Sequence, residues 1–275
     1  MSTTGPSEAV REPFDEPLHE PLDESLGERF HGPFGERVEP AAPPARRWGF
    51  GAYLFAEAVF LAASLLLVLP YVDAARPVPP PPAVLLLSLT VPTVLSAAAA
   101  MVVTWMRGGG PRNDLGLRVT RADLSRGFGF GCAGLMATIP AAALWSHVVG
   151  VDEANSAVAR LFAGQRFSVP LAAAVFLVVW LVAPVCEEIV YRGLLWGAME
   201  RNGANRWWAF GVTTLAFALA HFELTRTPLL LVIAVPIGLA RVYSDNIGAS
   251  IVAHQVNNLI PAVSLFMLMI GARPW

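Results

Sequence analysis

The sequence contains no lysine, only two cysteines and few charged residues of any kind. All 19 basic residues are arginines, and charged residues make up 15% of the 275 positions, against about 25% in soluble domains. The cysteines, Cys132 and Cys186, both lie in apolar runs, which argues against a disulfide framework and against a zinc-binding cysteine cluster. Hydrophobic residues reach 55%. This composition predicts a polytopic α-helical membrane protein with the lipid bilayer as its surroundings, and nothing in it indicates nucleic-acid binding.

Residues 1–47 differ from the rest of the chain. They hold ten acidic side chains and five arginines, and 12–22 repeat a loose Glu-Pro-apolar unit. Such a sequence has little apolar surface to offset the entropy of ordering, so we expect a disordered, solvated cytoplasmic tail. A docking tail is the alternative. The segment lacks the basic start and apolar core of a signal peptide.

Seven apolar segments follow and define a transmembrane domain over 48–275. They run approximately over 50–72, 83–106, 127–150, 169–198, 206–222, 228–243 and 248–270. A membrane span needs about 20 residues, so the fifth and sixth segments are short. An eighth helix could lie within 152–166, or the last segment could split at Pro261. We therefore predict an all-α bundle of seven or eight transmembrane helices.

Two further features of these segments bear on topology. The fourth is long enough to require a tilt or a kink, and Pro184 is the expected kink site. Arginines favour one set of connecting regions over the other by ten to five, so the positive-inside rule places the N-terminus in the cytoplasm.

The fourth segment carries three ionisable residues in an apolar run. Glu187, Glu188 and Arg192 lie between Val169 and Ala198, and an unpaired charge at membrane depth is costly. Residues four apart share a helix face, so Glu188 and Arg192 are expected to form an ion pair. Glu187 has no partner at that spacing and is left to face a cavity, which suits a general base.

Other segments add imidazoles and amides. Phe217 and His221 are four apart in the fifth segment, as are His254 and Asn258 in the seventh, where Asn257 also lies. A carboxylate base, imidazoles and an amide donor suit attack of an activated water on an amide carbonyl. A single intramembrane His or Asn is more often a contact between helices, and a Glu–Arg pair alone is more often structural.

Other polar residues of the apolar segments are not expected to take part in this chemistry. Glu57, His147 and Glu223 lie near segment ends and are expected at the membrane interface. Cys186 adjoins the carboxylates, where a packing residue is a better interpretation than a nucleophile.

The three motifs together resemble those of a known family. The pattern reads Glu187-Glu188-x-x-x-Arg192, then Phe217-x-x-x-His221, then His254-x-x-x-Asn258. It resembles the CAAX protease and bacteriocin-processing (CPBP) family, also called the Abi or type II CAAX prenyl endopeptidase group, and within it the lysostaphin resistance protein A-like bacterial branch. The resemblance covers about 169–265. The flanking runs 191–193 and 114–118 also look typical of the family.

The resemblance implies an intramembrane endopeptidase in a bacterial plasma membrane, acting on a membrane-associated peptide or protein. It implies that Glu187 activates water with help from His221, and that His254 and Asn258 stabilise the oxyanion. Glu188 and Arg192 would shape the site, with Phe217 and Asn257 in support.

The cofactor is left open by the sequence. Members of the family have been treated both as metal-dependent and as metal-free glutamate proteases. Glu187, His221 and His254 could bind one zinc ion, although the chain has no His-Glu-x-x-His helix.

Two alternatives and one geometric difficulty accompany this interpretation. A non-catalytic immunity or scaffold protein could use the same fold, and a proton-coupled transporter could use the same residues, although internal repeats are not evident. Counted along the helices, Glu187 falls on the cytoplasmic side of its segment and His221 toward the opposite end of its own. A kink, a tilt or a partial span must bring them together.

Overall fold

The computed structural model describes residues 48–71, 80–162 and 166–272. These ranges belong to Ala45–Trp275, one of the two units into which the chain divides. The tail predicted to be disordered, 1–47, lies outside the described residues.

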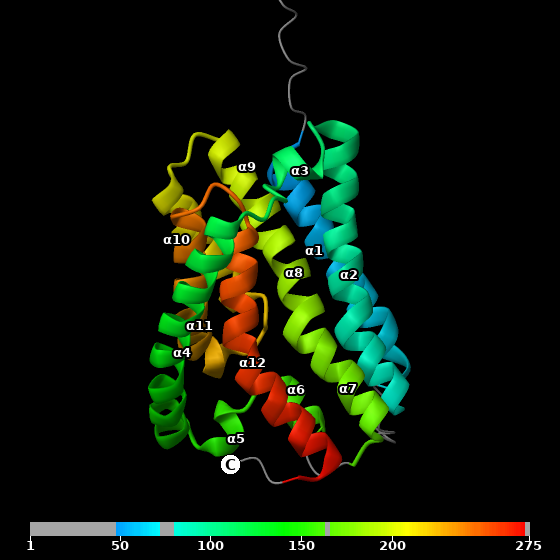
Figure 1. The fold of residues 1–275 in the computed structure, drawn as a ribbon. Coiled ribbons are helices and arrows are strands. Elements are labelled where there is room, and N and C mark those ends of the chain that lie inside the picture. Colours follow the sequence, from blue (N-terminus) through cyan, green and yellow to red (C-terminus); the bar gives the residue numbers. More distant parts are fainter. Residues whose placement is uncertain (1–47, 72–79, 163–165, 273–275) are drawn as a thin grey trace, which may run out of the picture. The chain divides into compact units, whose positions relative to one another are not determined.

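The described part is helical and contains no strand, which confirms the predicted all-α class (Figure 1). The longer helices are α1 (Phe50–Val68), α2 (Pro82–Arg107), α4 (Arg121–Val149), α7 (Val169–Leu177), α10 (Arg206–Leu219), α11 (Thr227–Val242) and α12 (Gly248–Ile270). The short ones are α3 (Pro111–Asp114), α5 (Val151–Ala154), α6 (Ala157–Phe162), α8 (Ala183–Glu188) and α9 (Trp196–Arg201). The 3₁₀ turns are η3 (Leu69–Tyr71) and η6 (Leu224–Arg226), and the π-helical segments are η4 (Val178–Val182) and η5 (Ile189–Leu195).

Six helices of the described part are long and apolar enough to cross a membrane: Phe50–Tyr71, Pro82–Arg107, Arg121–Val149, Val169–Arg201, Leu224–Val242 and Gly248–Ile270. The remaining apolar segment of the sequence forms α10, whose 14 residues are too few to span a bilayer. The region 151–162 contains the short α5 and α6, and α12 continues through Pro261 without a break.

The helix from Val169 to Arg201 is α-helical at its ends and π-helical on either side of α8. In η4 the Ala183 N–H donates to the carbonyl five residues back, Val178 O. By the same pattern the carbonyl of Val179 would receive the N–H of residue 184, which is proline and has none. The Asn258 side chain of α12 donates to Val179 O instead, at 3.2 Å. The position predicted to kink is therefore a π-helical turn whose free carbonyl is satisfied by a neighbouring helix.

The backbone of α4 packs closely against side chains of α12. A Cβ atom added at Gly131 would lie 2.5 Å from Val256 Cβ, and one at Gly134 would lie 2.5 Å from Asn257 Nδ2. Only glycine permits this approach, which is common at helix interfaces in membranes. Asn257 also donates to Gly131 O at 3.3 Å. This packing holds the helix that carries the second histidine motif.

A buried aspartate ties α3 to α9 and to the residues before α1. Asp114 accepts hydrogen bonds from Trp48 Nε1 at 3.1 Å, from the Gly109 N–H at 2.7 Å and from Arg201 Nη2 at 3.0 Å. The guanidinium of Arg201 also lies 3.3 Å from the centre of the Trp48 ring. The run 114–118, which looked typical of the family, therefore begins with a structural anchor.

Candidate active site

Glu188 and Arg192 form the ion pair that their spacing predicts. Arg192 Nη1 lies 3.0 Å from Glu188 Oε1, and both side chains are fully buried. Glu188 is at the end of α8 and Arg192 lies within η5. A buried pair of this kind compensates the cost of each charge, but only while both partners are present.

His254 of α12 lies between the two glutamates. Its Nδ1 is 2.9 Å from Glu188 Oε1, and its Nε2 is 3.6 Å from Glu187 Oε2. The Glu188 carboxylate can only accept hydrogen bonds, and it already accepts one from Arg192. The Nδ1 atom of His254 therefore carries a hydrogen, and its Nε2 atom faces Glu187. Glu187 retains 26% exposure of its side chain, whereas His254 and Glu188 are buried. Glu187 is thus the more exposed of the two carboxylates.

The ring of Phe217 occupies the centre of this cluster. It makes edge contacts with His221 and His254, at centroid distances of 4.8 and 5.4 Å. The Arg192 guanidinium lies 4.7 Å from the same ring centre, and Tyr191 packs on it at 5.5 Å. Both imidazoles therefore pack against one buried phenyl group.

The short α10 resolves the difference in depth between Glu187 and His221. Because α10 ends at Leu219, His221 follows it directly instead of lying at the far end of a full span. Its Nδ1 lies 2.8 Å from Phe217 O, so that nitrogen donates and Nε2 is left as an acceptor. Phe222, the next residue, has a positive φ of 54°. This backbone turns sharply at the exposed histidine.

The two asparagines of α12 face different neighbours. Asn258 is half-buried and uses one N–H for Val179 O. Asn257 is buried against α4 and donates to Gly131 O and Ala253 O. The contacts of Asn257 place it in helix packing, apart from the glutamates.

Glu187, His221 and His254 are the residues that could hold a metal ion by their chemistry. No group of three His, Cys, Asp or Glu side chains in the described ranges is placed to hold one. A zinc centre takes three or four protein ligands, and the contacts of Glu187, His221 and His254 do not assemble such a set. We therefore derive no step through a metal.

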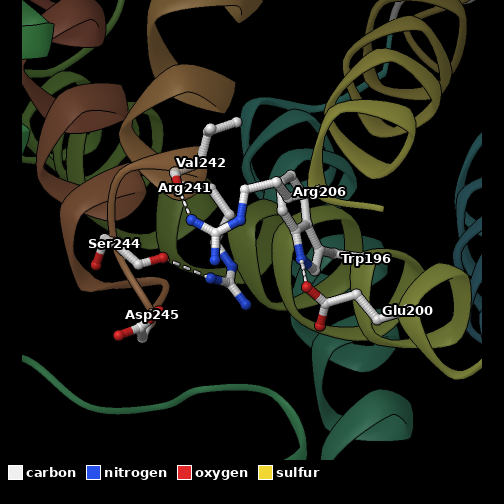
Figure 2. A pocket seen from close by; sticks show the side chains of 7 residues that line it. All are labelled: Trp196, Glu200, Arg206, Arg241, Val242, Ser244 and Asp245. Atoms are coloured by element: carbon white, nitrogen blue, oxygen red, sulfur yellow. Dashed lines mark hydrogen bonds between the residues drawn. The ribbon is translucent and has the colours of Figure 1, made fainter. Parts of the chain in front are cut away.

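A polar pocket lies beside the helix Val169–Arg201, at the end of α11 (Figure 2). Its lining residues are Trp196, Glu200, Arg206, Arg241, Val242, Ser244 and Asp245. Arg241 donates through Nε to Arg192 O at 3.2 Å and through Nη1 to Ser244 O at 2.7 Å. Trp196 donates to Glu200, and Arg206 donates to Val242 O. Two carboxylates balance the two guanidinium groups, and the pocket supports the backbone of η5.

Sequence reasoning missed one acidic residue near this cluster. Glu57 was expected at the membrane interface, and the structure places it two turns into α1. Its carboxylate interacts with the phenols of Tyr53 and Tyr191 and with the charge of Glu187. An acidic residue inside an apolar span is the sequence feature that could have indicated this position.

The comparisons with known proteins agree with the motifs. Residues 169–260 match the family model described as type II CAAX prenyl endopeptidase Rce1-like. No curated protein and no solved structure matches the chain. The matched segment runs from α7 into α12 and contains every residue of the three motifs. The chain is therefore an integral membrane protein whose segment 169–260 is similar to the Rce1-like type II CAAX prenyl endopeptidase family, in agreement with the resemblance of its motifs.

Proposed function

We propose that this protein is an intramembrane endopeptidase that hydrolyses a peptide bond with a water molecule activated by Glu187. One observation carries the proposal. His254 is held through Nδ1 by the buried Glu188, and its Nε2 faces the partly exposed Glu187 at 3.6 Å. This arrangement lies within the segment that matches a peptidase family.

Glu187 is the proton carrier of the proposed reaction. Its carboxylate takes a proton from water as the oxygen attacks the carbonyl carbon of the scissile bond, which forms a tetrahedral oxyanion. When the intermediate collapses, the C–N bond breaks and Glu187 returns the proton to the leaving amine. The products are a carboxylic acid and an amine, and the glutamate is unchanged.

His254 serves as a fixed polar group beside Glu187. Glu188 orients the ring, and Arg192 compensates the charge of Glu188. In its protonated form, His254 would donate through Nε2 to the developing oxyanion. Preorganised donors of this kind contribute most where water is excluded.

His221 and Asn258 have supporting roles in the proposal. With Nδ1 committed to Phe217 O, His221 presents Nε2 as an acceptor that can position the attacking water. Asn258 uses one N–H for Val179 O and has a second for the oxyanion. The substrate is a membrane-associated peptide or protein, because Glu187, Glu188 and His254 lie on helices that are apolar enough to span the bilayer.

The proposal is tested by offering the purified protein a library of membrane-associated peptides and identifying products by mass spectrometry. Wild type, Glu187→Gln and Glu153→Gln are compared, since Glu153 is exposed on α5 and outside the cluster. We expect specific cleavage by wild type and Glu153→Gln and none by Glu187→Gln. Each reaction is repeated with a metal chelator, which separates metal-bound from metal-free water. Cleavage that survives in Glu187→Gln would contradict the mechanism, and no cleavage by folded wild type would favour a non-catalytic scaffold.

A further inference from the structure

Glu57 is an ionisable residue inside a membrane-spanning helix, and it faces the candidate active site. It lies seven residues into α1, about 10 Å along the helix axis at 1.5 Å per residue. It is partly buried, and its Oε1 atom is buried without a hydrogen-bond partner among the described residues. Such residues in membrane spans face a cavity or a partner, not lipid.

The neighbours of Glu57 do not neutralise it. Its carboxylate interacts with Tyr53, Tyr191 and Glu187, and none of these side chains is a cation. Arg192 is already paired with Glu188 at 3.0 Å. Two carboxylates, Glu57 and Glu187, therefore repel one another, and the described part of the chain shows no arginine ion pair with either. A positively charged group between them would remove the repulsion.

Aromatic rings complete the surroundings of this pair. Tyr191 packs edge-on against Tyr53 at 6.2 Å and against Phe217 at 5.5 Å, which makes a row of three rings from α1 to α10. One guanidinium group already packs against this row, since that of Arg192 lies 4.7 Å from the Phe217 ring centre. Carboxylates beside aromatic faces are the chemistry that recognises ammonium and guanidinium groups.

We propose that Glu57 is a specificity-determining residue, which together with Glu187 binds a basic side chain of the substrate close to the scissile bond. The proposal rests on the peptidase function proposed above and adds a substrate class, peptides with lysine or arginine near the cleaved bond. The phenols of Tyr53 and Tyr191 interact with the Glu57 carboxylate. Binding the cation also brings the substrate chain against Glu187, the group that activates water.

The test uses one membrane-associated peptide that wild type cleaves, prepared with lysine or with the neutral, similarly long norleucine at each position around the cleaved bond. Glu57→Gln removes the charge and preserves the shape, and Glu153→Gln is the matched control. At one position, we expect wild type to prefer lysine by roughly ten-fold in kcat/KM, and Glu57→Gln to lose that preference. Its kcat/KM for the neutral peptide should stay within about three-fold of wild type.

A binding measurement separates failure of this proposal from failure of the peptidase function. Fluorescence anisotropy of the labelled lysine and norleucine peptides is measured with wild type and Glu57→Gln in detergent, whether or not cleavage occurs. Tighter binding of the lysine peptide to wild type alone supports the basic-group site. Three results would overturn it. Glu57→Gln could weaken binding of both peptides equally, Glu57→Gln could still prefer the lysine peptide, or wild type could bind both peptides equally. If Glu57→Gln does not fold, Glu57→Asp keeps the charge and is expected to keep the preference.

Discussion

The Nδ1 atom of His254 lies 2.9 Å from Glu188 Oε1, so a buried contact joins α12 to α8 between two of the three family motifs. Glu188 also accepts from Arg192, and the histidine presents its other nitrogen to Glu187. The second glutamate of the Glu-Glu pair is therefore a structural and electrostatic partner of the histidine. The first glutamate keeps the more exposed position, with 26% of its side chain accessible.

Replacement of His254 by glutamine should lower kcat/KM by about 10²–10³-fold, because it removes a preorganised donor beside Glu187. Most of the loss should appear in kcat, since the buried ring has little contact with the ground-state substrate. Steady-state kinetics on an identified peptide check this. His147→Gln, at an exposed position of α4, is the control and should behave as wild type. Unchanged kcat in His254→Gln would remove the histidine from the mechanism.

Loss of Arg192 should destabilise the protein more than loss of both charges of the pair. Arg192→Met leaves a buried glutamate without its cation, which costs about 3–5 kcal/mol. The double variant Glu188→Leu with Arg192→Met removes the buried charge and should recover most of that stability, but not activity. Thermal unfolding in detergent measures both variants. A double variant as unstable as Arg192→Met alone would show that the pair is not compensated in this way.

Asn258 has a structural contact that can be separated from its proposed role in catalysis. Asn258→Leu leaves the Val179 carbonyl without its donor, at a cost of about 1–3 kcal/mol. Adding Pro184→Ala supplies the missing backbone N–H and should restore part of the stability. Activity should remain low in the double variant if the asparagine also stabilises the oxyanion. Activity that returns together with stability would assign Asn258 to structure alone.

Two glycines of α4 provide a matched pair for the packing of α4 on α12. Gly131→Ala would place a Cβ 2.5 Å from Val256 Cβ and should destabilise the fold, whereas Gly129 has no neighbouring atom within 4 Å of an added Cβ. Gly129→Ala should be neutral or stabilise by up to about 1 kcal/mol through helix propensity. Unfolding midpoints of the two variants measure the difference. Equal midpoints would contradict the close approach of the two helices.

The sequence predicts the helical class and much of the cluster for a simple physical reason. Apolar length and composition determine which segments can enter a bilayer, and spacing of four along a helix determines which side chains share a face. These two rules correctly place Glu188 against Arg192, and they bring Phe217 next to His221.

Contacts between different helices could not be predicted from the spacing of residues along the sequence. That His254 reaches Glu188, and that Asn257 turns to α4 and not to the glutamates, depends on how α12 rotates against its neighbours. The glycines at 131 and 134 were a readable signal for that packing. The surroundings of Glu57 are likewise set by η5 packing on α1, which its position along the chain does not reveal.

The central claim is that Glu187, and not its neighbour Cys186, activates the attacking group. Both residues lie in α8, and Cys186 is a free, buried thiol. The most direct measurement compares cleavage of one identified peptide by wild type, Glu187→Gln and Cys186→Ala. We expect a loss of at least about 10²-fold for Glu187→Gln and a rate within about three-fold of wild type for Cys186→Ala. Loss of activity in Cys186→Ala, with cleavage retained in folded Glu187→Gln, would contradict the account.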